Sequence, residues 1–121
     1  MQTSRVNTLK LAVRGLRNAV LDRGSPGGSL TECNALEVIH NAISRRLGSA
    51  LDEWERTGSQ PDWDQALDSI PTDGEAYIGP SGGWIEFGVE DAQVLTRVAS
   101  EEVAWVRQQL DTLREALDMR S

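Results

Sequence analysis

Apolar side chains recur in the first part of the chain at the spacing of an α-helix. This spacing, with alternating steps of three and four positions, places them on one stripe and predicts a helix over 3–22. Glycine and proline at 24–28 cannot extend a helix cheaply, so the helix is expected to end before them. The stripe consists of five branched aliphatic residues: Val6, Leu9, Val13, Leu16 and Val20.

A second apolar stripe follows a signal for the start of a helix. Ser29 and Glu32 have the spacing of a capping box, in which two side chains satisfy free backbone donors. The pattern predicts a helix over 30–56 that ends before Gly58. Gly48 in its interior costs about 1 kcal/mol relative to alanine and indicates a close helix contact or a bend. The stripe consists of Leu36, His40, Ile43, Leu47, Leu51 and Trp54.

A third helix is predicted over 91–119. Two acids, Glu90 and Asp91, stand at its start, where they suit the positive end of the helix dipole. A helix of about 28 residues is roughly 42 Å long. It therefore belongs either to an elongated bundle or to a pair of copies joined along its far end. The regular part of its stripe is the candidate seam of such an oligomer: Val103, Val106, Leu110, Leu113 and Leu117.

The segment between the second and third helices has a different pattern. Residues 59–74 form a connector, with a short helix that starts at Pro61. Over 75–89, aromatic and β-branched residues flank a glycine-rich turn at 79–83, which predicts a β-hairpin. In its second strand, Trp84 points away from the face formed by Ile85, Phe87 and Val89.

These elements fit one domain. A chain of 121 residues lies within the usual size of a domain and can bury about two thirds of its unfolded surface. The predicted fold is α+β and mostly helical. It is a single domain over 1–121, with three long helices in an antiparallel bundle and the β-hairpin inserted between the second and third helices.

Charged residues are distributed unevenly along the chain. Residues 1–28 carry five bases and one acid, a net charge of +4, whereas residues 29–121 carry 7 bases and 18 acids, a net charge of −11. The cations Lys10, Arg14 and Arg17 are too few for strong binding to nucleic acid and are expected to flank the buried stripe of the first helix. The acidic body that stays exposed favours a protein partner with a basic surface, and it repels nucleic acid and anionic membranes.

The composition also indicates the cellular compartment. Cys33 is the only cysteine, so an intrachain disulfide is excluded and the chain suits a reducing cytoplasm. No apolar run approaches the ~20 residues that cross a bilayer. One lysine beside 11 arginines indicates a GC-rich genome, and a bacterial or phage source is expected.

Two patterns of chemical interest fall on the second predicted helix. Glu37 and His40 have the spacing of helical di-iron carboxylate sites, but such sites need the motif twice and the chain has one histidine. A hydrogen-bonded core histidine is the simpler interpretation. Cys33 stands two helical turns from His40, about 10 Å along the helix, which is too far for a nucleophile and its base. We expect no catalytic residue and no cofactor, and Glu37 and His40 are only weak metal candidates.

The predicted function is that of a small acidic protein-binding module, not an enzyme. It would act as an inhibitor or regulator that occludes a basic site on its partner, for example a nucleic-acid-binding site, as immunity proteins, antitoxins and phage anti-defence proteins do. Trp84 either anchors this interface or folds back on Trp54 and Trp63 as a small second core. The expected partner-binding residues are Trp84, Glu86, Glu101, Glu102, Asp52, Glu53 and Glu55.

Two other classes of function stay open. The first is a homo-oligomeric structural or assembly protein, joined as a homodimer or larger assembly through the aliphatic seam of the third helix. The second is a helical metal-dependent enzyme that uses Glu37 and His40.

Overall fold

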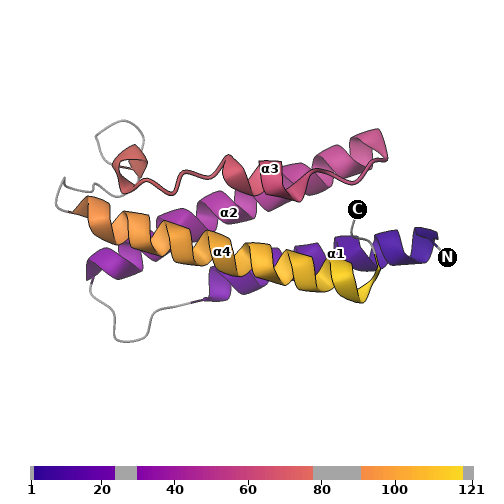
Figure 1. The fold of residues 1–121 in the computed structure, drawn as a ribbon, viewed down its shortest axis with the longest axis horizontal. Helices are drawn as coiled ribbons and strands as arrows, with labels where there is room; N and C mark the ends of the chain where they lie inside the picture. Colours follow the sequence, from indigo (N-terminus) through magenta and orange to yellow (C-terminus); the bar gives the residue numbers. More distant parts are fainter. Residues whose placement is uncertain (1, 24–29, 78–90, 119–121) are drawn as a thin grey trace.

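The computed structural model describes residues 2–23, 30–77 and 91–118. Its regular structure in these ranges consists of four α-helices and one short 3-10 helix (Figure 1). The three long helices lie within a few residues of the ranges predicted from the apolar stripes. In chain order the elements are α1 (Gln2–Asp22), α2 (Leu30–Thr57), α3 (Trp63–Asp68), η1 (Gly74–Tyr77) and α4 (Ala92–Ala116).

α1 and α2 form an antiparallel pair (Figure 1). The Lys10 ammonium pairs with Glu55 at 2.9 Å near one end of the pair. Further along, Arg17 Nε donates to the carbonyl oxygen of Ser44 at 2.9 Å. Residue numbers along α2 thus decrease as those along α1 increase, as expected for neighbouring helices joined by a short connection.

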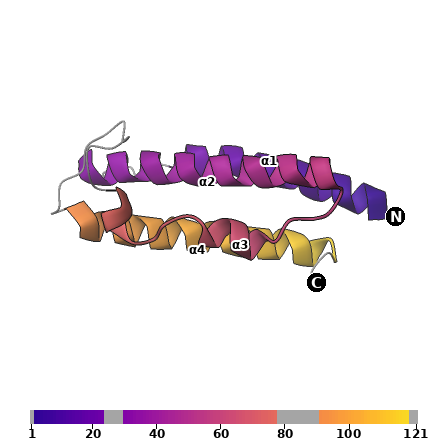
Figure 2. The same cartoon turned by 90° about the horizontal axis from the view of Figure 1, so that it is seen from above.

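α2 and α4 run parallel, which corrects the predicted antiparallel bundle of three helices. Glu32 pairs with Arg97 at 3.3 Å and His40 with Glu102 at 2.6 Å, so positions advance together along both helices. The physical reason is the connector. Residues 58–77, which we call the strap, run back along the bundle towards the end at which α2 begins (Figures 1 and 2).

The core lies along the seam between the helices, where the predicted stripes meet. In Figure 2, α1 and α2 form one layer and α3 and α4 form the other. The long helices are amphipathic, and none in the described ranges is long and apolar enough to span a bilayer. The largest side chains that are fully buried are Trp54, Leu9, Ile39, Ile43, Leu47, Leu67, Leu95, Leu110, Val13, Val20 and Val106.

Apolar side chains hold the strap against α2 and α4. Trp63, Leu67 and Ile70 are buried, and the Trp63 ring meets Trp54 edge to face with the ring centroids 6.0 Å apart. Trp63 Nε1 donates to Gln60 Oε1 at 2.9 Å, which satisfies the one polar group of the ring. The strap is therefore a packed layer of the molecule.

The end of the strap closely approaches α4 at Gly74. Its backbone N donates to Thr96 Oγ1 at 2.7 Å. A Cβ at this position would overlap the carbonyl oxygen of Ala92 and come within 2.9 Å of Leu95 Cβ. Glycine is thus required for the contact that fixes η1 beside the first turn of α4.

The structure corrects the α+β prediction to an all-helical fold in the residues that it describes. Ala76 and Tyr77, which the sequence pattern places in the first strand of a β-hairpin, belong to η1. Asp73 explains the local turn, because its carbonyl accepts from Ala76 N at 3.0 Å and its side chain accepts from Glu75 N at 3.1 Å. The described ranges contain no strand, and residues 78–89 of the predicted hairpin lie outside them.

α2 ends at Thr57, one residue beyond the range predicted from the sequence. Gly58 follows the last residue of α2 and has a φ of +77°, in the left-handed region that favours glycine. Its backbone N donates to the Trp54 carbonyl at 2.8 Å, which closes the last turn. From this point the chain turns back into the strap.

Candidate functional site

The strap carries a concentration of acidic side chains. Between Arg56 and Arg97 the sequence has neither lysine nor arginine. The strap contains five acidic residues of this stretch, and all five are exposed. The outer face of the strap is therefore anionic. The five acids are Asp62, Asp64, Asp68, Asp73 and Glu75.

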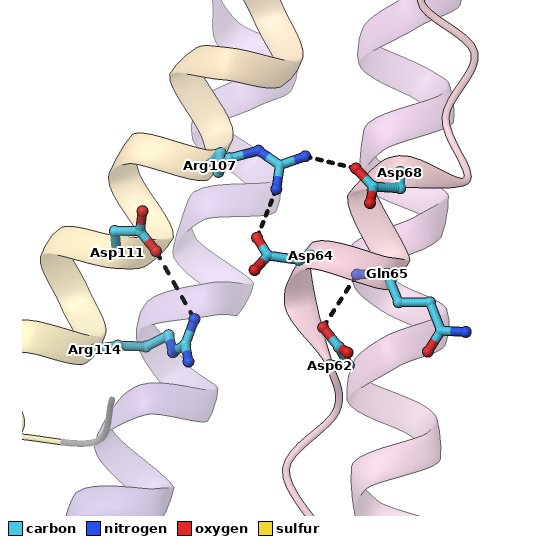
Figure 3. A network of polar contacts seen from close by, with 7 residues as sticks. All are labelled: Asp62, Asp64, Gln65, Asp68, Arg107, Asp111 and Arg114. Carbon is cyan, nitrogen blue, oxygen red and sulfur yellow. Dashed lines mark hydrogen bonds and ion pairs between the residues drawn. The ribbon is translucent and has the colours of Figure 1, made fainter. Parts of the chain in front are cut away.

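One arginine reaches these acids from α4. Arg107 Nη1 donates to Asp64 Oδ1 at 2.5 Å and Nη2 donates to Asp68 Oδ1 at 2.9 Å (Figure 3). Because Asp64 and Asp68 are one helical turn apart, both carboxylates reach a single guanidinium. Their side chains remain 66% and 72% exposed, so most of each carboxylate still faces solvent.

A polar groove separates α3 from α2. Asp62 caps α3, since its Oδ1 accepts from the backbone N of Gln65 at 3.1 Å (Figure 3). Asp62 also lines the groove, opposite Glu53 of α2. The groove has a volume of about 660 Å³, and hydroxyl and amide side chains form much of its wall: Ser49, Thr57, Ser59, Gln60, Gln65 and Ser69.

A buried polar cluster joins the end of α1, the middle of α2 and α4. Arg23 donates to both carboxylate oxygens of Glu102, with Nε to Oε1 at 2.8 Å and Nη2 to Oε2 at 3.0 Å. His40 Nε2 contacts Glu102 Oε1 at 2.6 Å. The Arg23 guanidinium also lies 4.0 Å from the centre of the Trp105 ring. Glu102 thus ties three segments together.

The cluster shifts the pKa of two of its members. Burial alone would raise the pKa of Glu102, but hydrogen bonds from Arg23 and His40 outweigh it and hold the pKa below its ordinary value of 4.5. The hydrogen bond to Glu102 raises the pKa of Arg23. An ionised carboxylate only accepts hydrogen bonds, so His40 Nε2 is the donor in its contact.

The weak metal candidates, Glu37 and His40, both line a shallow pocket of about 300 Å³ beside this cluster. Cys33 and Arg23 line the same pocket, and Cys33 is an exposed free thiol. His40 is 3% exposed and bonded to Glu102, in the manner of a satisfied core histidine. In the described ranges, no three His, Cys, Asp or Glu side chains form a group that could hold a metal ion.

The predicted partner-binding acids do not form one surface. Glu101 is exposed on α4, while Glu102 is 6% exposed and cannot present its carboxylate to a partner. Its prediction as a surface residue is corrected by the buried contacts of its two oxygens. Trp84 and Glu86 lie outside the described residues.

The three predicted acids of α2 face different neighbours. Glu55 pairs with Lys10, which also lies 5.1 Å from the centre of the Trp54 ring. Glu53 lies 3.8 Å from Arg56 and borders the groove beside α3. Asp52 lines a separate groove on the α1 side, among arginines. Of the three, only Glu53 therefore belongs to the same side of the molecule as the strap.

The candidate oligomer seam lies inside the bundle of a single chain. Val103, Val106 and Leu110 are 6%, 0% and 1% exposed, and Leu113 and Leu117 pack against the same core. These side chains are thus used in contacts within the chain. Val103, Val106 and Leu110 therefore have almost no exposed apolar surface to offer a second copy, whereas Leu113 and Leu117 are only partly buried.

The sequence reasoning missed the strap as an acidic surface. The sequence does indicate this surface, because it has no basic residue between Arg56 and Arg97. A net charge summed over residues 29–121 does not show where the acidic residues are concentrated. Arg23 was also missed as a buried partner of Glu102, because it follows the apolar stripe of α1 and reads as a residue of the loop. In comparisons with protein-family models, curated proteins and solved structures, the chain matches none.

Proposed function

We propose that this chain is a protein-binding module without enzymatic activity, whose strap binds a basic surface on a partner protein. Its role would be that of an inhibitor or regulator that covers the basic site, as immunity proteins, antitoxins and phage anti-defence proteins do. The observation that carries this proposal is the strap, which displays five exposed carboxylates, of which Asp64 and Asp68 pair with Arg107. Complementary charge of this kind favours fast and selective association.

The packing of the strap supports the proposal. Trp63, Leu67 and Ile70 anchor it in the core, and the cap from Asp62 and the contact at Gly74 fix its two ends. Its carboxylates are therefore displayed on an ordered backbone. Binding then requires little further ordering, which lowers the entropic cost of association.

Arg107 provides a test that separates charge from structure. Asp64→Asn with Asp68→Asn removes the ion pairs to Arg107 and two negative charges, whereas Arg107→Gln removes the same ion pairs and one positive charge. A partner with a basic surface should bind the aspartate variant about fivefold more weakly and the arginine variant more tightly. If these residues had only a structural role, both variants would change binding in the same direction.

The measurement is affinity capture of partners from cells of the source organism, followed by titration of the recovered partner at several salt concentrations. Glu37→Gln with Glu101→Gln is the matched control, because it removes two exposed charges outside the strap. Binding should weaken with salt and change little in this control. Failure to recover a partner, or affinity that ignores both salt and the strap variants, would refute the proposal.

A further inference from the structure

A second charged surface lies between α1 and α2, and its sign is opposite to that of the strap. It is a concave site of about 300 Å³, which we call the arginine groove. Three arginines and one aspartate line it, in a protein whose net charge is −7. Its lining residues are Arg14 and Arg17 from α1, and Arg45, Gly48, Ser49, Leu51 and Asp52 from α2.

The arginines of the groove differ from the others in the described part of the chain. In that part, Arg14, Arg17, Arg45 and the adjacent Arg46 have no carboxylate oxygen within 4.0 Å, although the pKa of Glu55 is lowered by its hydrogen bond with Lys10 and, less strongly, by the charge of Arg14. The remaining described arginines each lie within 4.0 Å of a carboxylate: Arg5, Arg23, Arg56, Arg97, Arg107 and Arg114. The arginines without such a partner are thus gathered in and beside one groove, although the chain has 19 acidic residues.

Backbone contacts position Arg17 in the groove. Its Nε donates to the Ser44 carbonyl at 2.9 Å, and the guanidinium makes no other hydrogen bond within the described residues. The guanidinium lies against α2 at Gly48, where a Cβ would come within 2.9 Å of its central carbon. Gly48 therefore makes room for a cation that is held by the backbone and not by a carboxylate.

We propose that the arginine groove binds a small ligand that carries one or two phosphate groups. Guanidinium groups donate paired hydrogen bonds that match the oxygens of phosphate, and three arginines from two helices line this groove. The volume is at the lower end of that of ligand sites, which suits a compact anion. The acidic body of the molecule would repel a long polyanion such as nucleic acid.

The test uses pyrophosphate as the probe and isothermal titration calorimetry of the full chain. Saturable binding with a Kd of about 1 mM or tighter is expected. Arg45→Gln should weaken it about tenfold, because a charged hydrogen-bond donor is lost. The neighbouring Arg46→Gln, which removes the same charge outside the groove, should change the Kd by no more than about twofold.

A variant that strengthens binding completes the design. Asp52→Asn removes the one carboxylate that lines the groove and should tighten binding, whereas Glu53→Gln, outside it, should not. The proposal is overturned if pyrophosphate does not saturate, or if Arg45→Gln and Arg46→Gln weaken binding equally. It is also overturned if the dicarboxylate succinate binds as tightly as pyrophosphate, since the site would then not select phosphate.

Discussion

Gly48 and Arg17 compete for the same space on α2. Alanine at an interior helix position stabilises the helix by about 1 kcal/mol relative to glycine. At Gly48 the added methyl would displace the Arg17 guanidinium, whose hydrogen bond to Ser44 contributes about 0.5 to 1.5 kcal/mol. The glycine that the sequence marks as a helix contact is therefore explained by a side chain of α1 resting on α2.

This competition predicts that the effect of Gly48→Ala depends on Arg17. In the native chain the substitution should leave the free energy of unfolding nearly unchanged. In an Arg17→Met background, Gly48→Ala should raise the free energy of unfolding by about 1 kcal/mol. Urea denaturation of the four proteins measures the difference.

Gly15→Ala serves as the control, because no atom lies within 4 Å of a Cβ at that exposed position of α1. It should stabilise both backgrounds alike. An equal gain from Gly48→Ala in both backgrounds would show that Arg17 does not occupy this space.

At the scale of the elements, Glu102 is a buried polar link from α4 to α2 and to Arg23, the residue that follows α1. Its folded pKa lies below 4.5, so its contribution to stability is fully present above about pH 4.5 and is lost as the pH falls through the folded value. Glu102→Gln should lower the free energy of unfolding by about 3 kcal/mol at pH 7, because Arg23 and His40 lose their ionised partner. The deficit relative to the native chain should shrink as the pH falls below 4.5.

Chemical denaturation of both proteins from pH 7 to pH 3 measures this change, and Glu101→Gln is the matched control. Glu101 is the exposed neighbour on the same helix, and its variant should follow the native protein closely at each pH. A Glu102→Gln deficit that stays constant with pH would exclude titration of Glu102 as its source.

How far the sequence predicts the elements depends on the length of their apolar patterns. Four or five turns of regular spacing determine the long helices, and His40 falls on the core stripe as expected. Ala76 and Tyr77 were misassigned because two or three residues carry too little periodicity to outweigh the turn at Asp73. Three acids of α2 face different neighbours because of the way other elements pack around this helix, and a count of charges cannot predict that packing. They are Asp52, Glu53 and Glu55.

At the scale of the whole molecule, the direction of α4 could not be read from the helix patterns. Parallel and antiparallel arrangements bury the same stripe, and only the path of the strap decides between them. The same path brings the two charged surfaces next to each other on α2. The strap contacts α2 and α4, while the arginine groove is formed by α1 and α2. Ser49 lines the grooves on both sides, and Arg45 also lines a pocket with Ser69 and Pro71 of the strap.

The parallel alignment of α2 and α4 also has a consequence for the order of folding. The contact between Arg17 and Ser44 closes a separation of 27 residues, whereas that between His40 and Glu102 closes one of 62. The longer closure costs about 0.7 kcal/mol more in chain entropy. We therefore expect α1 and α2 to pair first and α4 to dock last, which pulsed hydrogen exchange during refolding would detect as earlier protection of α2 amides. Simultaneous protection of α4 would mean that the strap forms early enough to carry it into place.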